Sequence, residues 1–174
     1  MNGKIGVISD THGNSKLMIQ VCDFLICKIE VSEIFHLGDN FEDYRFLKDM
    51  GFPVSGVPGL WDEEFRDNVT PKVLIKNFAN KKFIFAHAKF LIERLSREDL
   101  DVWCYGHTHK PKILVENGKV YFNPGHLKRD SDRGVLASYG VINFSNTAIE
   151  FKVLDIENSV IQSLNYSLGT ITKN

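Results

Sequence analysis

The chain is organised around one stretch, Asp101-Val102-Trp103-Cys104-Tyr105-Gly106-His107-Thr108-His109, in which an apolar run leads into two histidines. The run 101–105 is short, apolar and aromatic, so it predicts a buried strand. Gly106 is expected to let the backbone turn tightly where this strand ends. Paired histidines at a strand end are candidate metal ligands, although an isolated His-x-His pair is weak evidence by itself.

Length and composition bound the class of protein. The 174 residues include 43% hydrophobic residues, which is enough for one domain with a real core. The formal net charge of -1 predicts no nucleic-acid or membrane surface and leaves phosphorylated small molecules open as partners. The cysteines lie in apolar runs and are odd in number, which predicts buried free thiols in a reducing cytoplasm: Cys22, Cys27 and Cys104.

No signal-peptide pattern or apolar stretch of membrane-spanning length is found, so we expect a cytoplasmic protein. Its oligomeric state is left open, with a homo-oligomer as one alternative.

The first part of the chain alternates between strand and helix patterns. Short apolar runs predict strands over residues 4–9, 33–37, 83–86 and 101–105, with a weaker candidate over 53–57. Helical spacing and capping residues predict helices over 15–29, 43–50 and 90–95. This alternation predicts an α/β fold with parallel strands.

The pattern changes after the histidine pair. Asn117-Gly118 lies between two alternating runs, a strong signal for a hairpin, and Ser145-Asn146 lies between two more. The second half is therefore expected to add antiparallel strands to a domain of residues 1–155. Residues 156–174 have only scattered apolar side chains and are expected to form a C-terminal arm, partly disordered or packed on a partner.

Four of the predicted strands end in side chains that bind cations: Asp10 and His12, then Asp39, then His87, then His107 and His109. In open α/β sheets the site lies outside the carboxyl ends of the strands, where these side chains would meet. Carboxylates and imidazoles without thiolates favour Mn, Fe, Zn, Ni or Co over Ca. Six donors exceed what one tetrahedral ion takes, so two ions sharing a carboxylate fit better. Such pairs activate water and neutralise the charge of a transferring phosphoryl group.

Together these residues resemble the calcineurin-like metallophosphoesterase family, in particular its small bacterial and archaeal phosphodiesterase branch, which also includes a retromer sorting subunit. The resemblance covers residues 4 to about 155 and rests on Asp10-Thr11-His12, Gly38-Asp39, Gly59-Leu60-Trp61-Asp62, His87, Gly106-His107-Thr108-His109 and Asn123-Pro124-Gly125. It implies a four-layer αββα sandwich, in which helices flank two mixed β-sheets.

The resemblance also implies two ligand sets. One ion would be held by Asp10, His12, Asp39 and His109. The other would be held by Asp39 as a bridge, His87, His107 and an asparagine. Asp39, His87 and His107 would then carry the catalysis, in which metal-activated water hydrolyses a phosphate ester. The chain departs from the family at Leu60, which stands at the place of the asparagine and has no donor oxygen.

Several further residues are candidate substrate contacts, each with a plainer alternative: Asn14, Asn40, Trp61 and His126. Asn14 at a helix start would cradle phosphate or simply cap the helix. Asn40 would compensate for Leu60. Trp61 would stack on a nucleobase or fill the gap beside Leu60, and His126 is equally explained as a loop histidine.

Two other features have mainly structural explanations. His36, inside a strand, is expected to be a satisfied core histidine. Lys128, Arg129 and Arg133 would attract a phosphorylated substrate or form a solvated loop.

Two functions of different class follow. The first is a metal-dependent phosphoesterase, most simply a phosphodiesterase, whose second metal site is impaired by Leu60. The second is a catalytically weak or inactive metal-binding scaffold for protein–protein interaction.

Overall fold

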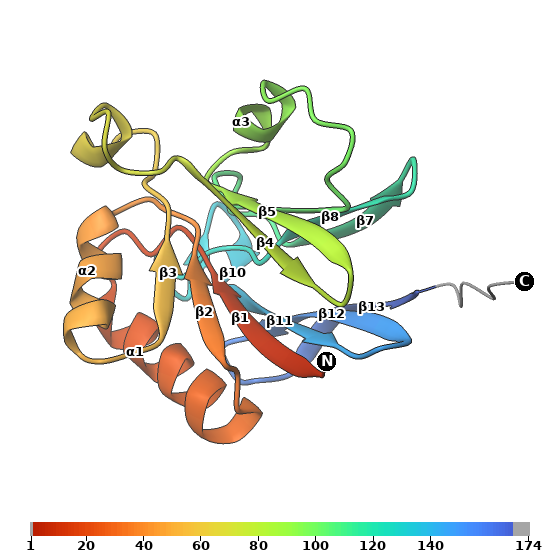
Figure 1. The fold of residues 1–174 in the computed structure, drawn as a ribbon. Coiled ribbons are helices and arrows are strands. Elements are labelled where there is room, and N and C mark those ends of the chain that lie inside the picture. The colour runs from red at the N-terminus through yellow and green to blue at the C-terminus, as the bar shows by residue number, and fades with distance from the viewer. Residues whose placement is uncertain (1, 169–174) are drawn as a thin grey trace, which may run out of the picture.

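Two β-sheets packed face to face form the centre of the computed structural model, which describes residues 2–168 (Figure 1). Helices α1 (Ser15–Phe24) and α2 (Phe41–Asp49) lie outside the first sheet, and the short α3 (Lys89–Glu93) lies outside the second. The predicted four-layer αββα sandwich is confirmed.

The first sheet has six strands in the order β13-β12-β11-β1-β2-β3. Their bounds are β1 Gly3–Ile8, β2 Glu33–His36, β3 Val54–Gly56, β11 Ser138–Phe144, β12 Ala148–Asp155 and β13 Val160–Ser167. Strands β1, β2 and β3 are parallel, as predicted, and β11 joins β1 in antiparallel orientation.

The second sheet has five strands in the order β4-β5-β6-β8-β7. Their bounds are β4 Val73–Phe78, β5 Lys81–Ala86, β6 Val102–Tyr105, β7 Lys112–Glu116 and β8 Lys119–Asn123. Strands β5, β6 and β8 are parallel. A two-stranded ribbon, β9 (Ser131–Asp132) with β10 (Val135–Leu136), lies in the basic loop.

Successive side chains of β5 pack alternately into the core between the two sheets and into the core under α3. Phe83 and Phe85 point between the sheets, where Phe85 stacks on Phe35 of β2 with ring centroids 3.8 Å apart. Ile84 and Ala86 point the other way and pack with Ile92 of α3. Because successive strand residues face opposite sides, a strand covered on both faces is a continuous apolar run.

The helices begin and end close to the predicted residues. Asn14 caps α1, since its Oδ1 accepts a hydrogen bond from the Leu17 N–H (3.3 Å). The helix continues as a π-helical turn, η1 (Leu25–Ile29), and ends at Glu30, whose φ is 62°. Helix α2 is followed by Gly51 with a φ of 87°, the left-handed position expected there. A single 3-10 turn, η2 (Glu63–Phe65), follows the Trp61 segment.

Three parts of the fold differ from the sequence-based expectation. Strand β4 was not expected; it forms a hairpin with β5 through Ala79 and Asn80, whose φ values are 49° and 60°. The two predicted hairpins exist but divide between the sheets, and β8 pairs with β6 in parallel. Of the cysteines, Cys22 and Cys104 are buried free thiols, whereas Cys27 is exposed.

The segment expected as a C-terminal arm contributes an edge strand instead. Strand β13 pairs with β12 over most of its length, and Leu164 and Tyr166 pack against the core between the sheets. Residues 169–174 of the expected arm lie outside the described residues.

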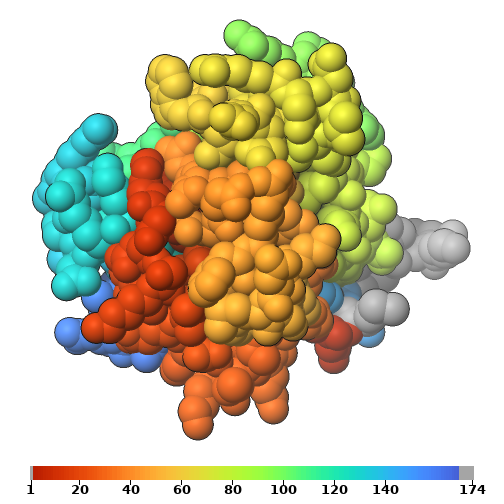
Figure 2. All heavy atoms as spheres, turned by 90° about the vertical axis from the view of Figure 1, so that its left-hand side faces the viewer, coloured from red at the N-terminus to blue at the C-terminus, as the bar shows by residue number. Residues whose placement is uncertain are grey.

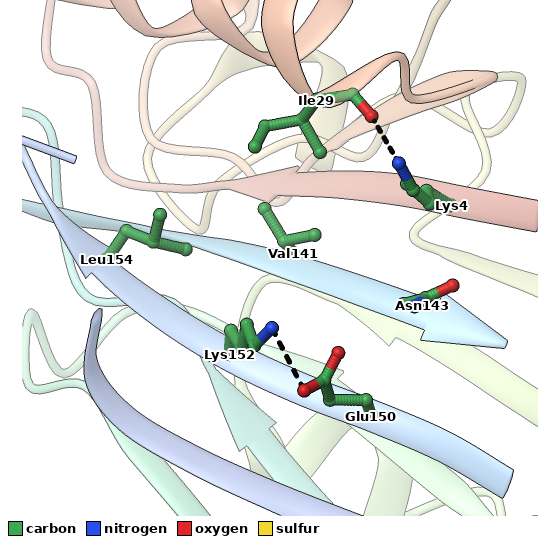
Figure 3. Close-up of a pocket in the computed structure, with 7 residues that line it drawn as sticks. All are labelled: Lys4, Ile29, Val141, Asn143, Glu150, Lys152 and Leu154. Atoms are coloured by element: carbon green, nitrogen blue, oxygen red, sulfur yellow. Dashed lines mark hydrogen bonds and ion pairs between the residues drawn. The ribbon is translucent and has the colours of Figure 1, made fainter. Parts of the chain in front are cut away.

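A cavity of about 250 Å³ lies on the outer face of the first sheet, beside the end of η1 (Figure 3). Val141 and Leu154 form its apolar floor, and Lys4 Nζ at its edge donates to the Ile29 carbonyl (2.9 Å). Lys4 stands at the start of β1, whereas the predicted metal donors follow the ends of the strands.

Within residues 2–168, none of the helices has the length and hydropathy needed to cross a bilayer.

The packing of β13 yields a stability prediction. Leu164→Ala should lower the free energy of unfolding by about 1–3 kcal/mol, because it removes partly buried methyl groups from the core. Ile161→Ala, on the same strand but 44% exposed, should change it by less than about 0.5 kcal/mol. Urea unfolding followed by circular dichroism measures both, and equal, negligible effects would mean that the segment is not an integral strand.

Candidate metal centre

The six predicted metal donors all follow strand ends, and five of them are held in a strained backbone. Asp10 and His12 follow β1, Asp39 follows β2, His87 follows β5, and the other two follow β6. Five of the six have positive φ: Asp10 (52°), His12 (49°), Asp39 (55°), His107 (65°) and His109 (58°). Left-handed non-glycine residues cost about 1–3 kcal/mol each and cluster at functional sites. Five of the residues that the sequence singled out thus share this conformation, which also occurs at turn and helix-end residues such as Ala79 and Glu30.

The donors form two groups that share Asp39. The first consists of Asp10, His12, Asp39 and His109, and the second of Asp39, His87 and His107. Within each group the ligand atoms lie within 4.8 Å of one another. The ligand sets implied by the family resemblance are thus brought together, except for the asparagine.

In the first group, acceptor atoms face one another at short range. His109 Nε2 lies 3.2 Å from His12 Nε2 and 3.3 Å from Asp10 Oδ1. His109 Nδ1 carries a proton that it donates to Asp132 Oδ2 (2.8 Å), so Nε2 of the neutral ring presents a lone pair. The buried Asp10 Oδ1 has no hydrogen-bond partner among the described residues. A divalent ion between these atoms would turn mutual repulsion into coordination.

The second group shows the same feature. The His87 ring is fully buried, and its Nδ1 donates to the Leu37 carbonyl (2.8 Å). Its Nε2 therefore presents a lone pair 3.3 Å from Asp39 Oδ1, with no hydrogen-bond partner in the described part of the chain. Buried polar atoms without partners are costly and rare. Both groups thus fit divalent metal ions by the chemistry of their own donors.

Burial and neighbouring charges shift the pKa of three donors in the first group, Asp10, His12 and His109. Burial would raise the pKa of Asp10, but the His109 ring, the Ser9 hydroxyl and nearby His87 together hold that pKa below its ordinary value. Proximity to the Asp10 carboxylate raises the pKa of His109 against its burial, with Asp132 acting in the same direction. Burial lowers the pKa of His12. Asp10 is therefore a carboxylate ready to coordinate a cation.

Asp132 was not singled out from the sequence, yet it orients His109. Its side chain is 1% exposed, and its other oxygen pairs with Arg129 and with Lys128 Nζ (3.7 Å). The Arg129 guanidinium and the His109 ring hold the pKa of Asp132 far below its usual range. The basic loop is thus neither free nor simply solvated, because it supports the carboxylate behind a metal donor.

His36 is a satisfied core histidine, as predicted. The Gly38 N–H donates to its Nδ1 (3.2 Å), and its Nε2 donates to Thr11 Oγ1 (3.0 Å). Thr11 in turn donates to Asp43 Oδ2 (2.6 Å), which also accepts the Gly13 N–H (2.8 Å). Burial lowers the pKa of His36 to about 4, so the ring stays neutral and keeps this chain of hydrogen bonds. The chain fixes the loop that carries Asp10 and His12.

Two glycines are required by close approach of the backbone. A Cβ on Gly106 would lie 1.8 Å from Ser9 Oγ and 2.6 Å from Asp10 Oδ2. Gly106 is therefore needed for space between the two sheets, and its φ lies outside the left-handed region. A Cβ on Gly59 would lie 2.2 Å from Asp39 Oδ1. The Gly59 turn is thus packed directly against the shared carboxylate.

The predicted substrate contacts occupy different places. Asn14 caps α1, and its Nδ2 donates to the Lys128 carbonyl (3.2 Å), so its amide is already used. Asn40 and Trp61 line one cavity with His12 and Asp39. Trp61 is 79% exposed, so it does not fill a gap beside Leu60. His126 is fully buried, and its Nε2 donates to the Val135 carbonyl (3.1 Å). It reaches the site only through His109, with ring centroids 5.3 Å apart.

The second group consists of Asp39, His87 and His107, and Leu60 stands where the family resemblance implies a further asparagine ligand. Leu60 is half-buried in the turn that follows Gly59. An alkyl side chain supplies no lone pair, so Leu60 cannot be the ligand that the family resemblance implies at its position.

Comparison with known proteins places the chain in a family. Residues 4–147 match the model of the calcineurin-like phosphoesterase superfamily domain. A predicted phosphoesterase from Streptococcus pneumoniae TIGR4 is 22% identical with a TM-score of 0.75, over 97% of this chain and 99% of that one. YfcE, a phosphoesterase from E. coli, is 23% identical with a TM-score of 0.71, over 92% and 98%.

Vacuolar Protein Sorting 29 from Cryptosporidium parvum is 16% identical with a TM-score of 0.71, over 97% and 99%. No curated protein sequence matches the chain. At these identities the solved structures support the fold alone, whereas the family model covers most of the chain. The protein therefore belongs to the calcineurin-like phosphoesterase superfamily.

Proposed function

We propose that this protein is a metal-dependent phosphoesterase, most simply a phosphodiesterase, that hydrolyses a phosphorylated small molecule. The observation that carries the proposal is the pair of donor groups sharing Asp39, with buried lone pairs aimed at one another. Divalent ions bound there would supply activated water and neutralise charge on the phosphoryl group. Mixed oxygen and nitrogen donors suit Mn, Fe, Zn, Ni or Co. A cytoplasmic location fits the three free cysteines.

The position of each residue in the site indicates its role in binding the metal ions or the phosphate. Asp39 joins the two groups, and the buried His87 is fixed through its Nδ1 hydrogen bond. Exposed His107 lies on the solvent side, with its ring centroid 5.1 Å from that of His87. Asn40 begins α2 without a capping side-chain bond and lines the cavity at Asp39, so its amide is placed for a phosphate oxygen or an ion.

The second candidate function is a metal-binding scaffold with little or no catalysis. Leu60 supports this candidate, because it has no donor oxygen at the place where the family resemblance implies an asparagine ligand beside His87 and His107. Both candidate functions require a metal ion at the first donor group. They differ in turnover and in whether the second donor group is occupied by an ion.

The first prediction concerns activity. Metal-stripped protein reloaded with Mn, Ni, Co or Zn should hydrolyse bis(p-nitrophenyl) phosphate, and His107→Ala should reduce kcat/KM at least about 100-fold, since charge stabilisation by a bound ion is worth several kcal/mol. Release of nitrophenolate measures the rate. Lys110→Ala, next to the motif but outside both donor groups, serves as the control and should retain activity. Equal rates for wild type and His107→Ala would contradict the proposal.

The second prediction uses Leu60 to separate enzyme from scaffold. Leu60→Asn should strengthen binding of a second ion at least about tenfold, because it adds a donor oxygen at the second group. Leu60→Ala removes the same leucine without adding a donor and should not. Native mass spectrometry counts ions per chain, and the diester assay runs in parallel. Wild-type turnover supports the enzyme, whereas turnover that appears only in Leu60→Asn supports the scaffold.

A further inference from the structure

The indole of Trp61 lies exposed at the rim of the candidate metal centre. It is 79% exposed and borders a cavity of about 280 Å³ together with His12, Asp39, Asn40 and Asp62. Leaving a large aromatic side chain in water forgoes the free energy of its burial. A ligand that covers the ring while it occupies the donors would recover that free energy.

Trp61 is carried by a rigid turn. The Asp62 carboxylate accepts hydrogen bonds from the Gly59 N–H (2.6 Å) and from the Asn40 N–H (3.2 Å), and so it fastens the turn to the start of α2. Gly59 itself is packed against the Asp39 carboxylate. The backbone that carries the indole is therefore held in place before any ligand binds, which lowers the entropic cost of stacking.

Charge differs between the two sides of the site. Next to Trp61 lies a second cavity whose walls carry the carboxylates of Glu42, Asp62, Glu63 and Glu64 and the guanidinium of Arg45. Arg45 is itself paired with Glu42 and with Glu64 (2.5 Å). The Trp61 side is thus net acidic.

The basic loop contacts the segment that follows His12, because the Lys128 carbonyl accepts a hydrogen bond from Asn14 Nδ2 (3.2 Å). In Figure 2 the segment around residues 60–70 forms the top of this face, and the cyan basic loop forms its left edge.

We propose that Trp61 stacks on a planar aromatic ring of a phosphate ester whose phosphate lies at the metal donors, and that the acidic cavity beside it disfavours rings with a negative charge. This inference rests on the proposed phosphoesterase function. Stacking on an aromatic side chain tolerates any base, because every base has a π face. The substrate class is therefore a nucleotide-like ester with an uncharged ring.

Binding measurements test the stacking without relying on turnover. In Mn-loaded protein, adenosine monophosphate should bind about 5- to 100-fold more tightly than ribose 5-phosphate, which has the same sugar phosphate but no base. Trp61→Ala should bring this ratio close to one, while Trp61→Phe should keep most of it. Phe46→Ala, a half-exposed aromatic of α2 outside both cavities, is the matched control and should leave the ratio unchanged. Isothermal titration calorimetry gives the affinities.

A second pair of ligands tests the charge. Orotidine monophosphate differs from uridine monophosphate by a ring carboxylate, and it should bind several-fold more weakly to the wild type. Glu63→Gln should narrow this gap, because it removes one of the facing negative charges. An unchanged gap in Glu63→Gln would overturn the role of the acidic cavity.

The outcomes separate this inference from the proposed function. Equal binding of adenosine monophosphate and ribose 5-phosphate to the wild type would overturn the stacking, even with full diester turnover. A Trp61-dependent preference for the base in a protein without turnover would support the ring site and count against the phosphoesterase.

Discussion

The fold holds closely spaced carboxylate oxygens and imidazole nitrogens in place at one edge of the sandwich, although their lone pairs repel one another. Around Asp10 and Asp39, carboxylate oxygens and imidazole nitrogens approach one another to between 3.2 and 3.5 Å. Atoms of like partial charge at this range repel more strongly where water is excluded. Hydrophobic burial between the two sheets, centred on stacked Phe35 and Phe85, supplies the opposing free energy. Burial of this core offsets the unfavourable free energy of holding the donor atoms close together.

The strain is held by hydrogen bonds that join the loops carrying the donors to one another and to the loop after β8. The Asp10 N–H bonds to the Gly38 carbonyl (2.9 Å), and the Gly106 N–H bonds to the His87 carbonyl (2.8 Å), so each donor loop is tied to another. Asn123 donates to the Gly106 carbonyl (2.9 Å) and accepts from the Gly125 N–H (2.9 Å), which ties the histidine pair to the loop after β8. These supports set the direction of each donor, as outer-shell partners do at metal sites.

Prediction from the sequence was most accurate for elements that are recognised by one local pattern, such as a continuous apolar run. Buried parallel strands are continuous apolar runs, so β1, β2, β5 and β6 and the donors that follow them could be located. Strand β13 could not, because an edge strand buries only every second side chain and its exposed positions make it resemble a polar tail.

The supporting residues of the site escaped prediction for a different reason. Asp132 lies among Lys128, Arg129 and Arg133, a pattern typical of a solvated loop. Its role depends on a contact with His109, 23 residues away, that no local pattern encodes. Trp61 was located, but whether its indole faces inward or outward depends on the Asp62 hydrogen bonds that shape its turn.

The absence of a side chain at Gly106 has a wider consequence. It lets the end of β6, in one sheet, approach Ser9 and Asp10 at the end of β1, in the other, more closely than any other residue would allow. Each donor group therefore takes members from both sheets, so an ion held there would clamp the two halves of the sandwich together. Cohesion of the sheets and occupancy of the centre then become thermodynamically linked, and the concentration of free metal acts as a variable of folding as well as of chemistry.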